Sequence, residues 1–552
     1  MYLDNGKIST RQVLRIGILE NIPVGIILVP FITTRLAGTY HIFALLFGLI
    51  MFSLYCIIIY GFSRSFPLGF IDTLHTSMGT FGRILEGIYS LRYVIKASLV
   101  ALFFSLIVQQ YMLRSFNLWV IIISFVLICG YGSARDIEKR GRLLEFLFWW
   151  MIIPLIFVVV FSITNIQWEV FSIPKLDVSV ITSGSLWAGS YGVLIVLSSV
   201  ELMIMTIYRE RKHQWKNSLN IFIWIVIAIV LSYIYVVGIL GEGWVRHGQG
   251  SALNVMQASS FANGTVERLD YPIFAFWIIG VFATASGYMF YAKEFAGSMF
   301  RLEREKSYKW ATLAITLLVL IAMILYNVSW FRDFVVAYIL WADIAISLII
   351  PTILLIVQKC RQSSLQKTSE HSMEKVSAGN VIKLFFLITC TSLIFTGCEG
   401  EKMVNELVNG ISESEAIDRK TPSLEGRSYI IRLAISTDHE ASEQSYGFAF
   451  ESADLSDYSG DSGGSLKTNT YSCGAGSINE AIEMFYNENG TTPDMGHMEN
   501  LLFDGSWQDY TPLLEEFSTM PNVSKAISVI DSSDKEYTLR ELIKNMYDAI
   551  DA

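Results

Sequence analysis

The sequence predicts a polytopic α-helical membrane protein that ends in a smaller α+β domain. Of its 552 residues, 53% are hydrophobic and the mean hydropathy is +0.46, values typical of chains with several membrane spans. Charge is divided unevenly, because residues 399–552 carry 29 Asp and Glu against 10 Lys and Arg, whereas the rest of the chain has a net charge of +10. These observations indicate a membrane domain over residues 1–358 and an acidic soluble domain over residues 399–552.

Apolar runs in the membrane domain are each long enough to cross a bilayer, which takes about 20 residues of helix. Ten such runs lie near 12–34, 41–61, 88–112, 117–134, 143–165, 186–208, 219–241, 272–292, 310–331 and 335–357. With a cytoplasmic N-terminus, 23 of the Lys and Arg residues outside the runs fall on the inner side and 6 on the outer side. Because loops rich in Lys and Arg stay in the cytoplasm, this split predicts a cytoplasmic N-terminus and an even number of spans.

The first run carries polar and helix-breaking residues where a lipid-facing helix has only apolar ones. Glu20, Asn21, Pro23 and Gly25 lie near its centre. Pro23 removes a backbone donor, and Gly25 lets the chain open or another group come close. An unwound backbone at this depth is tolerated where it lines a cavity, so one interpretation is a broken helix beside a small-molecule or ion site. The other interpretation is an ordinary proline-kinked helix with a buried glutamate.

Ionisable side chains in the other runs are Arg92, Lys96, Glu201 and Asp343. Such groups are costly within a membrane and are usually functional. Arg92 and Lys96 are one helical turn apart and share a face, so they either meet a partner carboxylate or extend toward the end of the span. Glu201 follows a segment rich in glycine and serine, and it is either functional or a structural hydrogen-bonding group.

Three strings of the membrane domain are similar to the B subunit of the GerA-type spore germinant receptors, a branch of the amino acid/polyamine/organocation transporter superfamily. They are KISTRQVLRIGILENIPVGIILVP from residue 7, SSVELMIMTIY from residue 198 and VERLDYPIFAFWIIGVFATASGYMFYAKE from residue 266. The resemblance covers about residues 7–358 and rests on the order and spacing of the strings. It implies a LeuT-like fold in which the ten spans form two inverted five-helix repeats.

The resemblance also implies a ligand site between the first and sixth spans, with the third and eighth spans as its walls. Half-helix ends at such a site meet the carboxylate and ammonium groups of an amino acid. Glu20 and Asn21 depart from the family pattern, which has small residues there, and this change alters the ligand or provides a charge for an ammonium or an ion. The candidate ligand-binding residues are Glu20, Asn21, Pro23, Gly25, Tyr93, Ser198, Glu201, Thr284 and Tyr288.

Residues 359–383 are polar and predict a flexible cytoplasmic linker. An apolar segment over 384–398 follows and ends in Thr-Gly-Cys at Cys398. Its apolar part, residues 384–395, measures about 18 Å as a helix, which is too short for a normal crossing. The segment resembles a bacterial lipoprotein signal with Cys398 as the lipidated residue. The alternative is an eleventh span in which Cys398 is an ordinary thiol.

The acidic region after Cys398 has the pattern of a folded α+β domain. RSYIIRLAIST and QSYGFAFESADL predict strands, and about 453–472 predicts a loop. A capped helix is expected from Ser477, with Glu480 three residues later, and further helices are expected around 511–518 and at 538–549. The helix start and the segment after it resemble the first domain of the C subunit of the same receptors, an extracytoplasmic lipoprotein.

Together the resemblances imply a receptor subunit of the spore inner membrane that binds a small nutrient, an amino acid, and signals to a partner A subunit. One alternative is a secondary active amino acid transporter with an accessory extracytoplasmic domain. Another is an anchor that only holds a complex together, which requires the site to be inert. The sequence carries no phosphate-binding loop, zinc spacing or nucleophile elbow, so no enzymatic activity, cofactor, metal or nucleic-acid partner is predicted.

Overall fold

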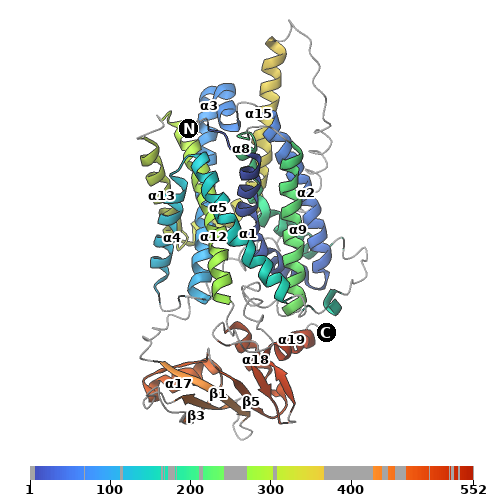
Figure 1. Ribbon diagram of the computed structural model, residues 1–552, viewed down its shortest axis with the longest axis vertical. Coiled ribbons are helices and arrows are strands. Elements are labelled where there is room, and N and C mark those ends of the chain that lie inside the picture. Colours follow the sequence, from blue (N-terminus) through green and yellow to red (C-terminus); the bar gives the residue numbers. More distant parts are fainter. Residues whose placement is uncertain are drawn as a thin grey trace.

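The described residues form a long helical bundle with a smaller unit of strands and helices at one end (Figure 1). Cys398, the predicted lipidation site, lies outside them, as does the whole apolar segment 384–398. The computed structural model describes residues 6–66, 69–111, 113, 116–162, 166, 168–171, 181, 183–210, 215–240, 270–302, 307–365, 427–437, 446–453, 468–495, 498–520, 523, 527–532 and 535–550.

A helix lies at each of the ten predicted apolar runs. Among the described residues, six helical segments are long and apolar enough to cross a membrane, and the first of these contains both α1 and α2. A multi-pass membrane protein is therefore confirmed, while ten crossings stay a prediction. The helices are α1 (Thr10–Ala37), α2 (His41–Ser65), α3 (Phe70–Tyr111), α4 (Leu118–Ser133), α5 (Ile137–Ser162), α7 (Gly184–Val196), α8 (Met203–Ile207), α9 (Trp215–Leu240), α12 (Asp270–Met299), α13 (Ser307–Leu325), α14 (Ser329–Ala337) and α15 (Asp343–Leu365), with short turns η1 (Gly38–Tyr40) and η3 (Trp168–Phe171).

The first helix, α1, packs against α7, α9 and α12 inside the bundle. It begins at a capping box, because the Gln12 amide donates to Ser9 Oγ at 3.3 Å and the Ser9 amide donates to Gln12 Oε1 at 3.0 Å. Just before this cap, the amide of Ile8 donates to the carbonyl of Arg209 at 3.0 Å. The start of α1 is thereby fixed to the chain that follows α8.

The interpretation of the first span as a broken helix is wrong, because α1 is helical without interruption from Thr10 to Ala37. Pro23 lies inside it and removes a backbone donor. Side chains of α12 donate to carbonyls on either side of this position. Thr284 Oγ1 donates to the Glu20 carbonyl at 2.9 Å, and Trp277 Nε1 donates to the Pro23 carbonyl at 2.8 Å. The α12 helix thus adds donors to the carbonyls of α1 around the proline, and α1 stays helical there.

Besides the kink at Gly79 inside α3, two segments of the bundle depart from α-helical geometry. Between α7 and α8 the chain forms a 3₁₀ helix, η4 (Leu197–Leu202), and between α14 and α15 it forms a π-helical turn, η5 (Tyr338–Ala342). A 3₁₀ stretch or a π turn in the middle of a helix often marks a hinge or a functional site. The sixth predicted span is therefore the irregular one, and the tenth carries a second irregularity.

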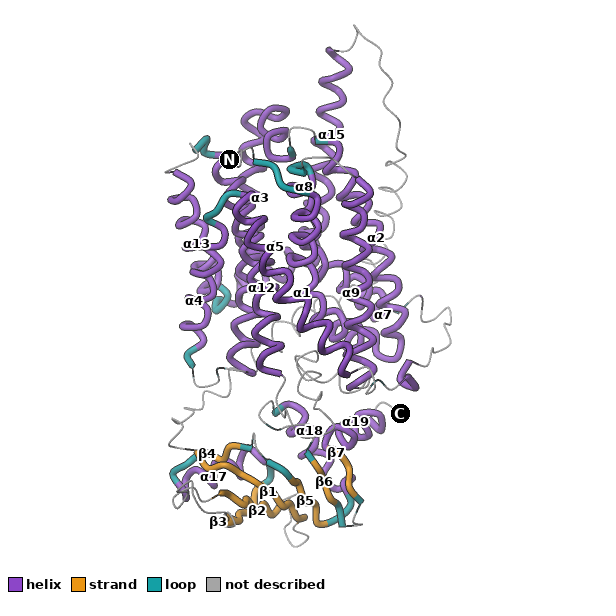
Figure 2. The backbone as a smooth tube through the Cα atoms, in the orientation of Figure 1, coloured by secondary structure: helices purple, strands orange, loops and turns teal. Residues whose placement is uncertain are grey.

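The C-terminal unit contains a mixed sheet in the order β3-β2-β1-β5-β6-β7, with β4 beside β1 (Figure 2). β1 is antiparallel to β2 and parallel to β5, so both predicted strands are confirmed. The predicted loop over 453–472 is wrong from residue 468 onward, because β3 pairs along the whole length of β2. β3 is an edge strand with polar residues on both faces, and its composition therefore resembles that of a loop. The strands are β1 (Arg427–Thr437), β2 (Tyr446–Ala453), β3 (Thr468–Ala475), β4 (Thr492–Asp494), β5 (Asn500–Asp504), β6 (Ser528–Ile530) and β7 (Glu536–Thr538).

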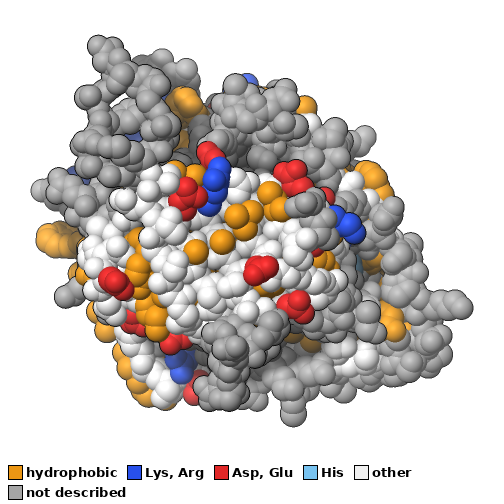
Figure 3. Space-filling model, turned by 90° about the horizontal axis from the view of Figure 1, so that it is seen from below, with side chains coloured by type: hydrophobic (Ala, Val, Ile, Leu, Met, Phe, Trp, Pro, Cys, Tyr) orange, Lys and Arg blue, Asp and Glu red, His pale blue; other side chains and the backbone are white. Residues whose placement is uncertain are grey.

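Helices of this unit are α17 (Ile478–Asn489), α18 (Thr511–Thr519), which follows the turn η8 (Trp507–Tyr510), and α19 (Leu539–Ile550). The predicted cap of α17 is confirmed, since the Glu480 amide donates to Ser477 Oγ at 3.2 Å. α18 and α19 lie between the sheet and the bundle, whereas the N-terminus and the end of α15 lie at the far end of the bundle (Figure 2). The outer face of the unit, seen from below, carries scattered acidic side chains and fewer basic ones (Figure 3).

Candidate functional site

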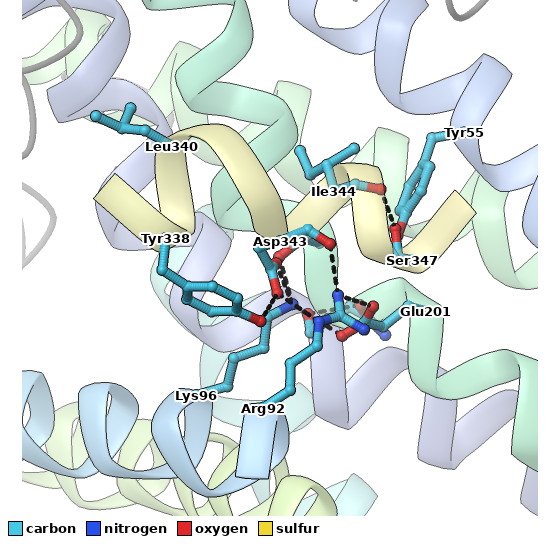
Figure 4. Close-up of polar contacts among 12 residues, drawn as sticks. Tyr55, Arg92, Lys96, Glu201, Tyr338, Leu340, Asp343, Ile344 and Ser347 are labelled. Carbon is cyan, nitrogen blue, oxygen red and sulfur yellow. Dashed lines mark hydrogen bonds and ion pairs between the residues drawn. The ribbon is translucent and has the colours of Figure 1, made fainter. Parts of the chain in front are cut away.

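Four charged side chains meet inside the bundle and form a closed network (Figure 4). Arg92 and Lys96 come from α3, Glu201 from η4, and Asp343 from the first position of α15. Their exposed fractions are 2%, 6%, 1% and 2%, so all four are buried. Arg92 and Lys96 therefore do not extend to the end of a span, and the partner carboxylate expected for them is present twice.

Each cation of this network contacts both carboxylates. Arg92 Nη2 lies 2.5 Å from Glu201 Oε2, and Arg92 Nε lies 2.7 Å from Asp343 Oδ1. Lys96 Nζ lies 2.8 Å from Glu201 Oε1 and 2.6 Å from Asp343 Oδ2. The network is neutral as a whole, which is the condition under which charges persist away from water.

Hydrogen bonds from neighbouring residues complete the network, with one exception. Tyr338 Oη donates to Asp343 Oδ1 at 2.9 Å, and Lys96 Nζ donates to Ser198 Oγ at 3.1 Å. Arg92 Nη2 also donates to the Asp343 carbonyl at 3.0 Å. Arg92 Nη1 is buried and has no hydrogen-bond partner among the described residues. The network therefore retains one donor that an incoming acceptor could use.

The irregular segments η4 and η5 carry or adjoin the two carboxylates. Glu201 is in η4, and Asp343 directly follows η5. Within η5, the Leu340 carbonyl accepts a hydrogen bond from Tyr191 Oη of α7 at 2.7 Å. In η5 a side chain of an adjacent helix thus binds a backbone carbonyl, and both departures from α-helix coincide with the charges.

Two tyrosines on the helices predicted as walls of the site border the network. The rings of Tyr93 on α3 and Tyr288 on α12 are tilted against each other, with centroids 5.8 Å apart. Lys96 Nζ lies 5.6 Å from the centroid of the Tyr288 ring. Both tyrosines are buried, at 1% and 3% exposure. Tyr93, Ser198, Glu201 and Tyr288 are therefore brought together around one buried set of charges.

Glu20 belongs to a second buried pair. Arg140 Nη2 of α5 donates to Glu20 Oε1 at 2.8 Å and to the Ala283 carbonyl at 2.9 Å, and its Nη1 donates to Ser286 Oγ at 3.0 Å. Glu20 Oε2 and Arg140 Nε have no hydrogen-bond partner among the described residues. This pair joins α1, α5 and α12, and nothing in its contacts connects Glu20 with the network of Arg92.

The remaining candidates on α1 contact other helices. Asn21 links to η4, because Ser199 Oγ donates to Asn21 Oδ1 at 2.7 Å, while Asn21 Nδ2 donates to the Gly17 carbonyl at 2.7 Å. A Cβ atom added at Gly25 would lie 2.5 Å from Ile229 Cδ1 and 2.8 Å from Leu197 Cδ2. Gly25 thus allows α9 and η4 to pack closely against α1. Pro23 and Thr284 take part in the contact between α1 and α12 described above.

Four charged residues of these clusters are not among the predicted ligand-binding set, namely Arg92, Lys96, Asp343 and Arg140. The sequence identifies Asp343 only as an ionisable residue within a span. It places Arg140 with the basic residues outside the spans, yet Arg140 is buried at 1% exposure. The i, i+4 spacing of Arg92 and Lys96 is the signal that carboxylates would be found opposite them. No pattern in the sequence indicates that Arg140 reaches Glu20.

Comparison with known proteins gives structural and family relationships. A variant of the manganese transporter of Eremococcus coleocola is similar at 9% identity and a TM-score of 0.42, covering 72% of this chain and 94% of that one. MhsT in complex with L-phenylalanine is similar at 10% identity and a TM-score of 0.42, covering 68% and 98%. No match was found among curated proteins. The family described as "Spore germination protein" matches residues 7–330, more than half of the chain, and the protein belongs to this family.

Proposed function

We propose that this protein is a spore germinant receptor subunit that binds a zwitterionic nutrient, an amino acid, within the membrane. The network of Arg92, Lys96, Glu201 and Asp343 carries this proposal. Burying four charges in an apolar bundle costs more than filling the same space with hydrophobic side chains. In this chain, which belongs to a family of spore germination proteins, the four charges fit a ligand that carries both signs of charge.

A zwitterion can exchange with the internal ion pairs. Its carboxylate would accept from Arg92 Nη1, the donor without a partner among the described residues. Its ammonium would compete with Lys96 for Glu201 and Asp343, which lie 2.8 Å and 2.6 Å from Lys96 Nζ. Each internal ion pair that opens gives way to an ion pair with the ligand, so the exchange keeps the network neutral and avoids an isolated buried charge.

Signalling requires that the ligand binds one conformation better than another. The network joins α3, η4 and α15, so a ligand that opens it changes how three segments are held together. η4 is the segment best suited to respond, because its 3₁₀ geometry is less favourable than α-helix. We propose that this change is passed to an A subunit, and that the C-terminal unit lies outside the spore inner membrane with Cys398 lipidated.

The test is germination and uptake in the native host. A chromosomal Glu201→Gln variant is compared with wild type, a deletion strain and a control, Glu145→Gln. Glu145 also contacts two cations, Arg11 at 2.6 Å and Arg15 at 2.8 Å, but it lies on α5 and is outside the network. Spore germination is followed against a panel of amino acids, and amino acid uptake is measured in growing cells.

We expect Glu201→Gln and the deletion to abolish the germination response to one or a few amino acids, with normal uptake and a normal response in Glu145→Gln. Normal germination with impaired uptake would instead identify a transporter. Labelling with radioactive palmitate tests the lipid anchor separately, since Cys398→Ala should remove the label. A wild-type chain that never takes up label would favour an eleventh span.

A further inference from the structure

The C-terminal unit is connected to the bundle by a hydrogen bond from one arginine. Arg540 Nε, in the first turn of α19, donates to the carbonyl of Ile239 at 3.0 Å. Ile239 is the penultimate residue of α9. The last four carbonyls of an α-helix have no partner within the helix, so this carbonyl needs an outside donor. A cation there also lies at the negative end of the helix dipole.

The Arg540 end of this contact is firmly held within the C-terminal unit. α19 begins with a reciprocal cap, in which the Thr538 amide donates to Glu541 Oε2 at 2.9 Å and the Glu541 amide donates to Thr538 Oγ1 at 3.3 Å. The Leu539 amide donates to the Ile527 carbonyl at 3.1 Å, which ties the helix to the edge of β6. Tyr547 and Ser518 join α19 to α18 through their hydroxyl groups at 2.8 Å.

The Ile239 end is part of the helix that packs along α1. α9 contacts α1 and α2, and Ile229 of α9 occupies the space beside Gly25. Nearer its C-terminal end, Tyr233 forms a hydrogen bond with His41 of α2. A shift of α1 or α2 therefore moves α9, and the end of α9 is the part of that helix that meets the C-terminal unit.

We propose that Arg540 is the docking contact through which the C-terminal unit follows the position of α9. The C-terminal unit then responds to the conformation of the bundle, and the surface formed by the start of α19 is its interface with the membrane domain. This inference goes beyond the proposed function, because it holds whether the bundle binds a nutrient, transports a solute or does neither.

Hydrogen–deuterium exchange of the full-length chain in lipid nanodiscs tests the proposal. The variants are Arg540→Met, which removes the donor and the charge, and Arg540→Lys, which keeps the charge. The control is Arg432→Met, which makes the same charge change on β1 of the same unit. Arg432 is 53% exposed and lies 3.7 Å from Glu451.

In Arg540→Met we expect backbone exchange to become roughly tenfold faster both in the last turn of α9 and in the first turn of α19, because the charge-assisted hydrogen bond that joins them is removed. Arg540→Lys should give a smaller increase, and Arg432→Met should match wild type at both sites. Protection of β1 and β5 reports that the unit remains folded. Unchanged exchange in α9 would overturn the proposal, as would acceleration confined to α19, since Arg540 would then stabilise only its own helix.

Discussion

The sequences of α1 and of the segment from α7 to α8 suggest that α1 is the irregular one, but the structure shows the reverse. α1 contains Pro23 and Pro30 and is α-helical throughout. The segment from Gly184 to Ile207 contains no proline, yet it passes through six residues of 3₁₀ helix in η4. In these two segments the position of proline does not decide where the helix departs from ideal geometry.

The difference lies in what neighbouring helices offer. Around Pro23, the carbonyls of Glu20 and Pro23 receive donors from Thr284 and Trp277 of α12, which hold α1 against a neighbouring helix. In η4, polar side chains are held from two sides. Glu201 is bound by Arg92 and Lys96 of α3, and Ser199 is bound by Asn21 of α1. The 3₁₀ stretch of η4 thus coincides with the residues that α1 and α3 hold.

Removal of the Glu201 carboxylate in η4 tests this difference and should have the largest effect on stability. Glu201→Ala leaves Arg92 and Lys96 with Asp343 as their one shared carboxylate in the network, and we expect a loss of about 3–5 kcal/mol in the free energy of unfolding. Glu201→Gln, which can still accept hydrogen bonds, should lose less. Thermal unfolding of the protein in detergent measures both variants.

A double variant separates charge from shape at the same site. Lys96→Met with Glu201→Gln removes one charge of each sign, so the network is again neutral. We expect it to be more stable than Glu201→Gln alone. If the double variant is no more stable, charge balance does not hold η4 in place.

The corresponding change on α1 concerns the pair of Glu20 and Arg140. Glu20→Ala removes one of three hydrogen-bond partners of Arg140, which keeps the Ala283 carbonyl and Ser286. We therefore expect a loss of about 2–3 kcal/mol, smaller than for Glu201→Ala. A thermodynamic cycle with Arg140→Met measures the coupling. An equal or larger loss than at Glu201 would mean that α1, and not η4, depends most on its charges.

The close contact at Gly25 gives a prediction about packing. Gly25→Val should block the ligand response, as expected from the sequence, but the structure adds a cause in the neighbouring Ile229 and Leu197 side chains. Overpacking of this kind costs about 1–3 kcal/mol. The double variant Gly25→Val with Ile229→Ala should regain stability. If Gly25→Val alone keeps full stability but loses the ligand response, Gly25 acts directly in ligand binding and not through packing.

Sequence reasoning predicted the helices and the charged residues better than the contacts between them. Helices and shared helix faces can be read from residues close together in the sequence. The apolar runs and the face shared by Arg92 and Lys96 were predicted in this way. The meeting of Glu20 with Arg140 joins residues 120 positions apart, and no local pattern encodes it. The break expected at Pro23 failed, and the donors that α1 receives around it come from α12.

The substitution with the smallest expected effect removes one of the hydrogen-bond donors that α12 provides to α1. Thr284→Val removes the hydrogen bond to the Glu20 carbonyl while keeping the size of the side chain, and we expect a loss of about 0.5–1.5 kcal/mol in the free energy of unfolding. In a Pro23→Ala background the restored amide donates to the Leu19 carbonyl, four residues back, and not to the Glu20 carbonyl, so we expect the same substitution to cost a similar amount. Thermal unfolding of the four chains gives the coupling between the two positions. A similar cost in both backgrounds would show that Thr284 stabilises the contact of α12 with α1, whereas a smaller cost in the Pro23→Ala background would show that its hydrogen bond compensates for a distortion of the helix by the proline ring.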